Sequence, residues 1–316
     1  MVYERELEGK LFALHEDLMT GTYRHGAYEP FTVYDPKQRR IHKANVRDRV
    51  VHQAVVNVLE PIVDPKFIHD SYSCRVGKGT HAAVRMLRTF LLEESQNRRR
   101  TTYALKCDVR KFFDSVDHAT LFRLLCRHVS DPHMRDLLEL VISSFSTASD
   151  KGLPLGNLTS QLFANVYLHE LDRFVKHDLH EKRFLRYCDD FVIVSDSRER
   201  LYSLVPKLNA FLSEHLGLHL HPNKVTVRSW GQGIDFLGYV SLPHATIVRT
   251  KTARRMRLHI TDSNATSYLG LCTHASAYSL AQELRNAVWF RRGSESGRVR
   301  SSYTVSSVPD RFAPPS

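Results

Sequence analysis

Apolar residues recur at helical spacing in several long segments of the chain. In residues 3–20, Leu7, Leu11, Leu14 and Leu18 are three or four positions apart, which predicts an amphipathic helix. The same spacing predicts a helix that opens at Arg47 and is stopped by Pro61. Further helices are predicted at 81–94, 132–145 and 198–215. Others are predicted after Asp117, which would be the N-cap, after Gln161, and in two segments beyond residue 249.

Runs rich in β-branched and aromatic residues predict strands around three acidic positions. Phe184–Tyr187 and Phe191–Val194 flank Asp189-Asp190, which predicts a tight hairpin with two carboxylates at its tip. Taken alone, an Asp-Asp pair is more often an ordinary polar turn. A separate acid changes this interpretation, because the strand Tyr103–Asp108 also ends in a carboxylate.

Acids at the ends of neighbouring strands can converge on a hard cation such as Mg²⁺, which prefers oxygen ligands and keeps substrate phosphates as the remainder. Asp108, Asp189 and Asp190 are therefore the predicted metal ligands. Two such ions can activate a 3′-hydroxyl and stabilise a leaving pyrophosphate.

Composition agrees with a nucleic-acid partner without requiring one. The 316 residues include 45 Lys and Arg against 34 Asp and Glu, a net charge of +11 that suits a phosphate backbone but also any basic soluble protein. The five cysteines form no Cys-x-x-Cys pair, which indicates a reducing compartment and no structural zinc. Without a signal peptide or a long apolar run, we expect a cytoplasmic protein with no membrane partner.

The motifs and their order resemble those of reverse transcriptases over approximately residues 30–280. The resemblance is carried by Asp108 with Phe112-Phe113, Gly156 to Gln161, Tyr187-Cys188-Asp189-Asp190, Lys224, and Phe236-Leu237-Gly238-Tyr239. It implies an α+β right-hand polymerase: a palm with an antiparallel sheet backed by helices, fingers and a small helical thumb. It also implies an RNA-directed DNA polymerase that extends a DNA or RNA primer with dNTPs on an RNA template, using two Mg²⁺ ions, with Mn²⁺ as a substitute.

On this resemblance the chain divides into four parts. Residues 1–100 are expected to hold the fingers and the N-terminal part, and residues 101–245 the palm, of which 115–160 is partly a junction between the two. Residues 246–292 would form the thumb. Residues 293–316 are rich in Ser, Arg and Pro and are expected to be disordered.

The resemblance assigns further residues to the incoming nucleotide. Lys37, Arg39 and Arg40 in a basic hairpin would contact the triphosphate, the alternative being solvated charges. Phe113 would be the steric gate against the ribose 2′-hydroxyl, while the adjacent Phe112 would fill the core. The full set of predicted nucleotide contacts is Lys37, Arg39, Arg40, Phe113, Leu155, Gly156 and Gln161.

Two other roles follow from the resemblance. Lys224 would protonate the departing pyrophosphate, the alternative being a surface Lys that contacts the nucleic-acid backbone. The predicted primer and template contacts are Arg75, Tyr187, Phe236, Leu237, Gly238, Tyr239 and Arg254.

Leu155-Gly156-Asn157-Leu158-Thr159-Ser160-Gln161 stands where most reverse transcriptases carry Gln-Gly…Ser-Pro. This pattern resembles the enzymes of diversity-generating retroelements, as do Tyr28–Phe31, Tyr72–Arg75 and Ser267–Gly270 with His274. That group copies a template-repeat RNA with errors at adenines and works with a small basic pentameric accessory protein.

Alternative functions stay open at this point. A phage-defence or retron-type reverse transcriptase would share the core motifs, whereas a group II intron protein is not expected because the chain lacks the length for its extra regions. The non-enzyme alternative is an RNA-binding module on a silent polymerase fold. It requires a missing metal carboxylate, and Asp108, Asp189 and Asp190 are all present.

Overall fold

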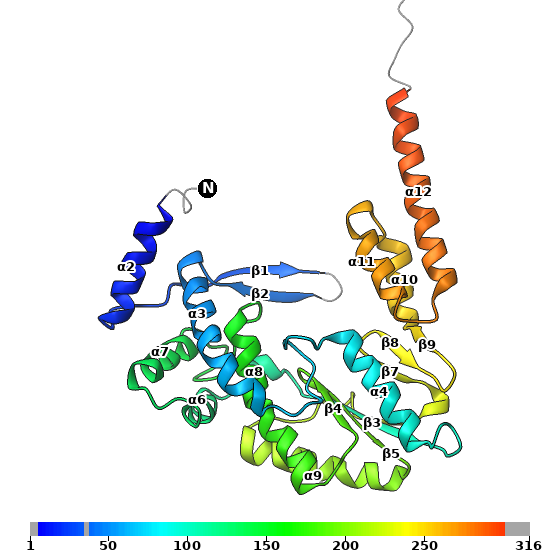
Figure 1. The fold of residues 1–316 in the computed structure, drawn as a ribbon, viewed down its shortest axis with the longest axis horizontal. Helices are drawn as coiled ribbons and strands as arrows, with labels where there is room; N and C mark the ends of the chain where they lie inside the picture. Colours follow the sequence, from blue (N-terminus) through cyan, green and yellow to red (C-terminus); the bar gives the residue numbers. More distant parts are fainter. Residues whose placement is uncertain (1–5, 35–37, 301–316) are drawn as a thin grey trace, which may run out of the picture. The chain divides into compact units, whose positions relative to one another are not determined.

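The computed structural model of the protein describes residues 6–34 and 38–300, with side chains up to residue 289. Lys37 lies outside the described residues. The chain divides into two compact units, residues 1–232 and 233–316 (Figure 1). Both contain helices and antiparallel strands, which confirms the α+β class predicted from the sequence.

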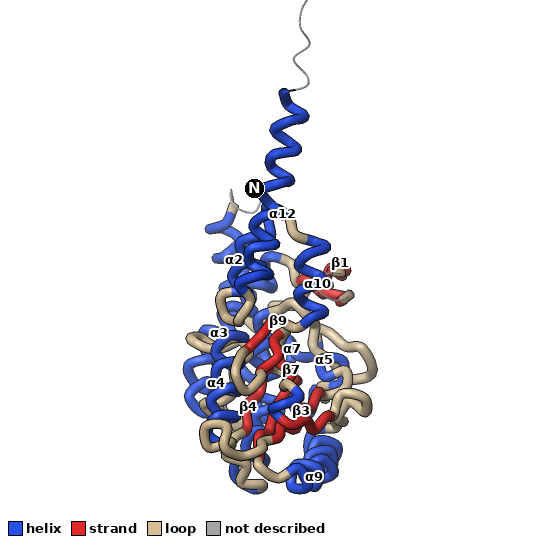
Figure 2. Tube along the Cα trace, turned by 90° about the vertical axis from the view of Figure 1, so that its right-hand side faces the viewer, coloured by secondary structure: helices blue, strands red, loops and turns tan. Residues whose placement is uncertain are grey.

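A four-stranded antiparallel sheet lies at the centre of the first unit. Its order is β4-β5-β3-β6, so the β4–β5 hairpin pairs with a strand far from it in the sequence. Figure 2 shows these strands in red, with helices around them. The bounds are β3 (Tyr103–Asp108), β4 (Phe184–Tyr187), β5 (Asp190–Ser195) and β6 (Thr226–Ser229).

Four helices of the first unit begin at a short polar side chain that accepts a hydrogen bond from the first turn. Asn45, Asp117, Asp131 and Ser197 do so for α3, α6, α7 and α9, which confirms Asp117 as an N-cap. The helices are α2 (Leu7–Met19), α3 (Val46–Val63), α4 (Thr80–Glu94), α5 (Phe112–Ser115), α6 (His118–Cys126), α7 (Pro132–Ser143), α8 (Leu158–Arg173) and α9 (Arg198–Leu216), with short turns at Asp64–Lys66, Phe174–Asp178 and Trp230–Gln232. A separate hairpin pairs β1 (Glu29–Val33) with β2 (Arg39–Lys43).

Strands β3, β4 and β5 are largely buried on both faces, whereas the edge strand β6 is partly exposed. Alternation along the strands places Leu105, Phe191 and Ile193 on one face, and these belong to the main core together with residues of α8 and α9. Helix α4 packs on β4 and β5, whose other buried side chains, Val192 and Val194, lie on the opposite face. Asp190 shares that second face because it stands two positions from Val192, and Asp108 shares it because it is the register partner of Asp190.

Two predicted helices differ in detail from the structure. Helix α3 does not stop at Pro61 but runs to Val63, because the ring of proline imposes a helical φ and permits a final turn after it. In α2, Leu14 is buried, whereas Leu7 and Leu11 are exposed. The helical spacing was therefore read correctly, but only part of the stripe packs against the core.

The second unit joins a three-stranded sheet to three helices. Its bounds are β7 (Ile234–Phe236), β8 (Tyr239–Ser241), β9 (Thr246–Val248), α10 (Thr250–His259), α11 (Asp262–Cys272) and α12 (Tyr278–Arg300). The hydroxyl of Tyr239 donates to the carbonyl of Leu271 at 3.0 Å, and the N–H of Ser276 donates to the carbonyl of Thr246 at 2.7 Å. These bonds tie the sheet to the helices.

The second compact unit begins at Gly233, so it holds the hairpin at 234–241 together with the helices α10 to α12. The division into fingers, palm and thumb stays a prediction. Helix α12 continues to Arg300, whereas the sequence predicts disorder from residue 293. Residues 301–316 lie outside the described residues.

Candidate functional site

Strand pairing brings the three predicted carboxylates to one end of the central sheet. Asp108, the last residue of β3, is the register partner of Asp190, the first residue of β5. Asp189 precedes it in the two-residue turn after β4, and its carbonyl accepts a hydrogen bond from Val109 N–H at 3.2 Å. The acids that are distant in sequence therefore lie on adjacent strand ends.

The turn that carries Asp189 has an unusual backbone. Cys188 has a φ of +55°, a left-handed conformation that non-glycine residues adopt rarely. Two-residue hairpin loops favour positive φ because this matches the twist of the strands. The turn places Asp189 between the paired residues Tyr187 and Asp190.

Two lysines face the carboxylates. The ammonium of Lys224 lies 2.8 Å from Asp108 Oδ2, and that of Lys106 lies 3.9 Å from Asp190 Oδ1. The side chain of Lys106 lies on the same face of the sheet as that of Asp108, because Lys106 is two residues earlier in β3. The hydrogen bond to Asp108 raises the pKa of Lys224, so this side chain holds its proton firmly.

The charges at this edge are nevertheless not balanced. Burial, followed by the charge of Asp108, raises the pKa of Asp189. Burial also raises the pKa of Asp190 to about 6, although Lys106 acts against it. Like-charged groups that share a half-buried site repel one another, and a cation between them would relieve that repulsion.

The donor set suits a hard divalent cation. All three side chains offer carboxylate oxygens, the ligands that Mg²⁺ and Mn²⁺ prefer over nitrogen or sulfur. Within residues 6–34 and 38–300, no three acidic, His or Cys side chains already stand in a metal-holding arrangement. Asp108 is instead paired with Lys224. Asp108, Asp189 and Asp190 are the residues that would hold the ion.

The predicted nucleotide loop is joined to the basic hairpin. The N–H of His42 in β2 donates to the carbonyl of Leu155 at 2.9 Å, and Asn157 Nδ2 donates to the carbonyl of His42 at 2.8 Å. Gly156 has a φ of +101°, and a Cβ there would lie 2.5 Å from Ile41 Cγ2. Glycine is therefore required by both the backbone and the close approach of β2.

The remaining predicted nucleotide residues differ in exposure. Arg39, Arg40 and Gln161 are exposed. Phe112 is buried and Phe113 is half-buried. Both rings lie in the helical turn α5, which follows Lys111 in a left-handed conformation.

Arg75 is engaged inside the protein rather than turned toward a template. Its guanidinium donates to Asp64 Oδ1 at 2.6 Å and to the carbonyls of Ile68 and Ser71 at 2.8 and 3.1 Å. Its remaining nitrogen also bonds Asp64. The predicted template contact is thus not supported by this geometry, and Arg75 instead fixes the loop before α4. Tyr187 is half-buried, and its hydroxyl accepts a hydrogen bond from Thr80 at 3.2 Å.

In the second unit, the predicted primer-contacting hairpin is partly a packing element. Phe236 and Tyr239 are buried, whereas Leu237 and Gly238, at φ of +50° and +89°, form the half-buried turn between them. Arg254 is exposed on α10. Direct contact with nucleic acid is therefore open to Leu237, Gly238 and Arg254, but not to the two buried rings.

Sequence reasoning missed three residues around the site: Lys106, Asn157 and Arg186. A signal existed for Lys106, a charged residue two positions before Asp108 in an otherwise apolar strand. Asn157 reads as a helix N-cap, yet its side chain makes no capping bond and binds β2 instead. Arg186 lies inside the strand beside the acids, where a charge is unexpected.

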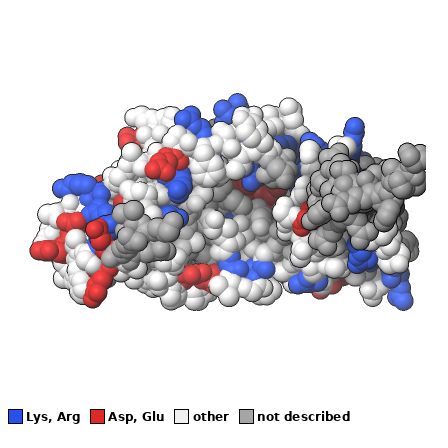
Figure 3. Space-filling view, turned by 90° about the horizontal axis from the view of Figure 1, so that it is seen from above, with Lys and Arg blue, Asp and Glu red and all other residues white. Residues whose placement is uncertain are grey.

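Basic and acidic side chains are mixed on the surface of the protein (Figure 3). Figure 3 shows Lys and Arg side chains interspersed with Asp and Glu on the face seen from above. In residues 6–34 and 38–300, no helix combines the length and the apolar character needed to cross a membrane.

Comparison with known proteins gives relatives for most of the chain. Residues 34–241 match the family described as reverse transcriptase (RNA-dependent DNA polymerase). Protein YkfC of Escherichia coli (strain K12) is 25% identical over 282 residues, covering 75% of this chain and 72% of the relative. The group II intron-encoded protein LtrA of Lactococcus lactis subsp. cremoris is 24% identical over 305 residues, covering 73% of this chain and 49% of the relative.

The fold has a counterpart among solved structures. Telomerase from Candida albicans, solved with a fragment of telomeric RNA, superposes with a TM-score of 0.56 at 11% identity, covering 89% of this chain and 56% of that one. The chain thus spans about half the length of the telomerase and of the intron-encoded relative. Because the family match covers well over half of the sequence and includes all three strand-end acids, the chain belongs to the reverse transcriptase family of RNA-directed DNA polymerases.

Proposed function

We propose that this chain extends a primer with dNTPs on an RNA template, using metal ions held by Asp108, Asp189 and Asp190. The observation that carries the proposal is the convergence of these acids on adjacent strand ends, with raised pKa values at Asp189 and Asp190. When bound, two Mg²⁺ or Mn²⁺ ions would supply charge stabilisation for the attacking and leaving oxygens.

The chain's own residues would bind and orient the substrates. Lys224 is protonated beside Asp108 and is suited to give a proton to the leaving pyrophosphate. Phe113, half-buried near the acids' strand, would exclude a 2′-hydroxyl. Arg39 and Arg40 would hold the triphosphate, because β2 is bonded to the loop that carries Leu155 and Gly156.

Primer extension tests this proposal. The purified chain, an RNA template, an annealed primer, dNTPs and Mg²⁺ should give full-length cDNA, and Asp108→Asn should reduce the rate by ~10²-fold or more. Asp136→Asn is the matched control, since Asp136 is exposed on α7. Wild-type activity in Asp108→Asn, or equal loss in Asp136→Asn, would contradict the assignment.

We further propose that the enzyme is of the diversity-generating type, error-prone at template adenines. Support comes from Leu155, which is half-buried, offers the nucleotide no polar side-chain atom and is fixed through its carbonyl to β2. In this proposal the template is a repeat RNA and the partner a small basic pentameric accessory protein. The DNA beside the gene tests it: a pair of variable and template repeats is expected, and their absence would count against the subtype.

A further inference from the structure

Arg186 is a fully buried charge in the strand that leads into the acidic turn. It lies in β4 between Leu185 and Tyr187, and its exposed fraction is 0%. Burying a guanidinium is strongly unfavourable unless the charge is paired and its N–H groups are bonded. Asp172 of α8, also 0% exposed, provides the pairing through two parallel bonds of 2.6 Å.

The other N–H groups of Arg186 reach three different segments. One donates to Ser71 Oγ at 3.1 Å, one to Asn165 Oδ1 at 3.2 Å, and one to the carbonyl of Cys188 at 3.1 Å. Together with the two bonds to Asp172, all five donors of the guanidinium are used. Arg186 therefore links α8, the loop at 70–73 and the acidic turn.

The bond to the Cys188 carbonyl bears directly on Asp189. That carbonyl belongs to the peptide group that joins the two residues, so its direction sets the position of the Asp189 backbone. Cys188 is left-handed at φ +55°, a conformation that is unfavourable for a non-glycine residue. A fixed donor beneath the turn offsets that cost and selects one orientation of the peptide.

We propose that Arg186, held by Asp172, is a positioning residue for the Asp189 carboxylate. A buried ion pair is a poor device for stability alone, because apolar residues of similar size often serve as well or better. Apolar residues, however, cannot donate to the Cys188 carbonyl. The inference rests on the proposed function only in taking Asp189 as a metal ligand.

The decisive variant replaces both charges, Arg186→Met with Asp172→Leu. It should fold with a Tm near that of the wild type. Its affinity for Mn²⁺, measured by electron paramagnetic resonance of the free ion, and its primer-extension rate should each fall about 10- to 100-fold, the usual effect of losing a group that orients a metal ligand. Leu121→Ala, a buried change on α6, controls for loss of stability alone and should leave Mn²⁺ affinity unchanged.

Two further variants keep the test decisive. Arg186→Lys retains the charge but has too few donors for all the contacts, so it should also weaken Mn²⁺ binding; it replaces the double variant if that one does not fold. Adding Cys188→Gly to the weakened variant should restore several-fold of the Mn²⁺ affinity, because glycine adopts positive φ without strain.

The outcomes separate this inference from the proposed function. If the wild type makes cDNA and Asp189→Asn loses Mn²⁺ binding while the double variant binds Mn²⁺ like the wild type, the positioning role of Arg186 is wrong and the polymerase assignment stands. If the wild type makes no cDNA, the proposed function fails, and Mn²⁺ affinity still decides whether Arg186 positions Asp189.

Discussion

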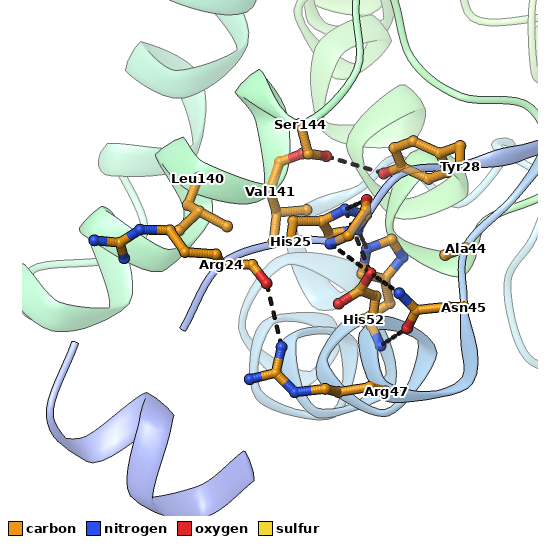
Figure 4. Close-up of polar contacts among 12 residues, drawn as sticks. Arg24, His25, Tyr28, Ala44, Asn45, Arg47, His52, Leu140, Val141 and Ser144 are labelled. Atoms are coloured by element: carbon orange, nitrogen blue, oxygen red, sulfur yellow. Dashed lines mark hydrogen bonds and ion pairs between the residues drawn. The ribbon is translucent and has the colours of Figure 1, made fainter. Parts of the chain in front are cut away.

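The first unit contains two acidic sites that solve the same electrostatic problem in opposite ways. Asp48 in α3 is completely buried, and its carboxylate accepts bonds from Tyr23 OH at 2.7 Å, Gly26 N–H at 2.9 Å and Asn45 Nδ2 at 2.7 Å. Figure 4 shows the polar contacts of His25, Asn45 and His52 around the start of this helix. The site is enclosed and saturated with donors.

Asp189 and Asp190 are less buried than Asp48, yet their negative charge is less well compensated by hydrogen-bond donors. Asp189 and Asp190 are half-buried, and each has a raised pKa because burial and like charge oppose ionisation. Burial alone therefore does not mark a functional acid. A structural carboxylate is surrounded by donors, whereas one that serves a metal or substrate is left with charge to neutralise.

The largest contrast should appear in activity. Asp189→Asn removes a metal ligand and should lower primer extension by ~10²-fold or more, while it relieves repulsion and leaves the free energy of unfolding unchanged or slightly higher. Activity and urea denaturation of the same preparation measure both effects. A variant that is inactive because it is unfolded would refute the functional reading of this acid.

Asp48→Ala should show the reverse behaviour. Its loss leaves the buried donors of Tyr23, Gly26 and Asn45 without an acceptor, at about 1 kcal/mol or more each, so the unfolding free energy should fall by about 3 kcal/mol or more. Activity per folded molecule should change little. Urea denaturation monitored by circular dichroism measures the loss, and a decrease below about 1 kcal/mol would show that Asp48 does not stabilise the fold as a buried acceptor.

The carboxylates could be predicted from the sequence, whereas the residues that hold the surrounding segments in place could not. Asp108 and Asp189 could be placed because strand patterns end at them, and strand ends are readable from local composition. Arg186 could not, because its partners Asp172 and Asn165 reach it only through packing of α8 on the strand. Asn157 was also missed, since an Asn before a helix looks like an N-cap whether it caps or binds a distant strand.

Acidification should lower the free energy of unfolding, because His52 is buried near Asp48. This residue is 2% exposed, and burial, with the neighbouring His25, lowers its pKa from 6.5 to about 4, while Asp48 acts against that shift. The unfolded chain therefore binds a proton that the folded chain refuses, so stability is lost as the pH falls from above 6.5 towards 4. Between pH 7 and pH 5 the loss should be about 2 kcal/mol.

The contribution of His52 is isolated by comparing the wild type with His52→Gln. Glutamine does not titrate and can still bond Thr159, which lies 3.3 Å from His52 Nδ1. The slope of unfolding free energy against pH should flatten in the variant. Parallel slopes for the two proteins would show that His52 does not carry the effect.

The smallest expected effect concerns fidelity at Leu155, a residue of the loop bonded to β2 whose side chain offers no hydrogen bond. A polar contact that tightens only around a well-placed nucleotide adds about 1 kcal/mol, hence several-fold in discrimination. Leu155→Gln should therefore lower misincorporation several-fold, most visibly opposite template adenines, while polymerisation continues. Leu158→Gln, an exposed change in the first turn of α8, is the matched control. The error spectra are measured by sequencing cDNA made on one defined RNA. Equal spectra for the wild type and Leu155→Gln would show that Leu155 only packs beneath the loop. An equal decrease of errors in Leu158→Gln would show that the added amide acts without regard to its position.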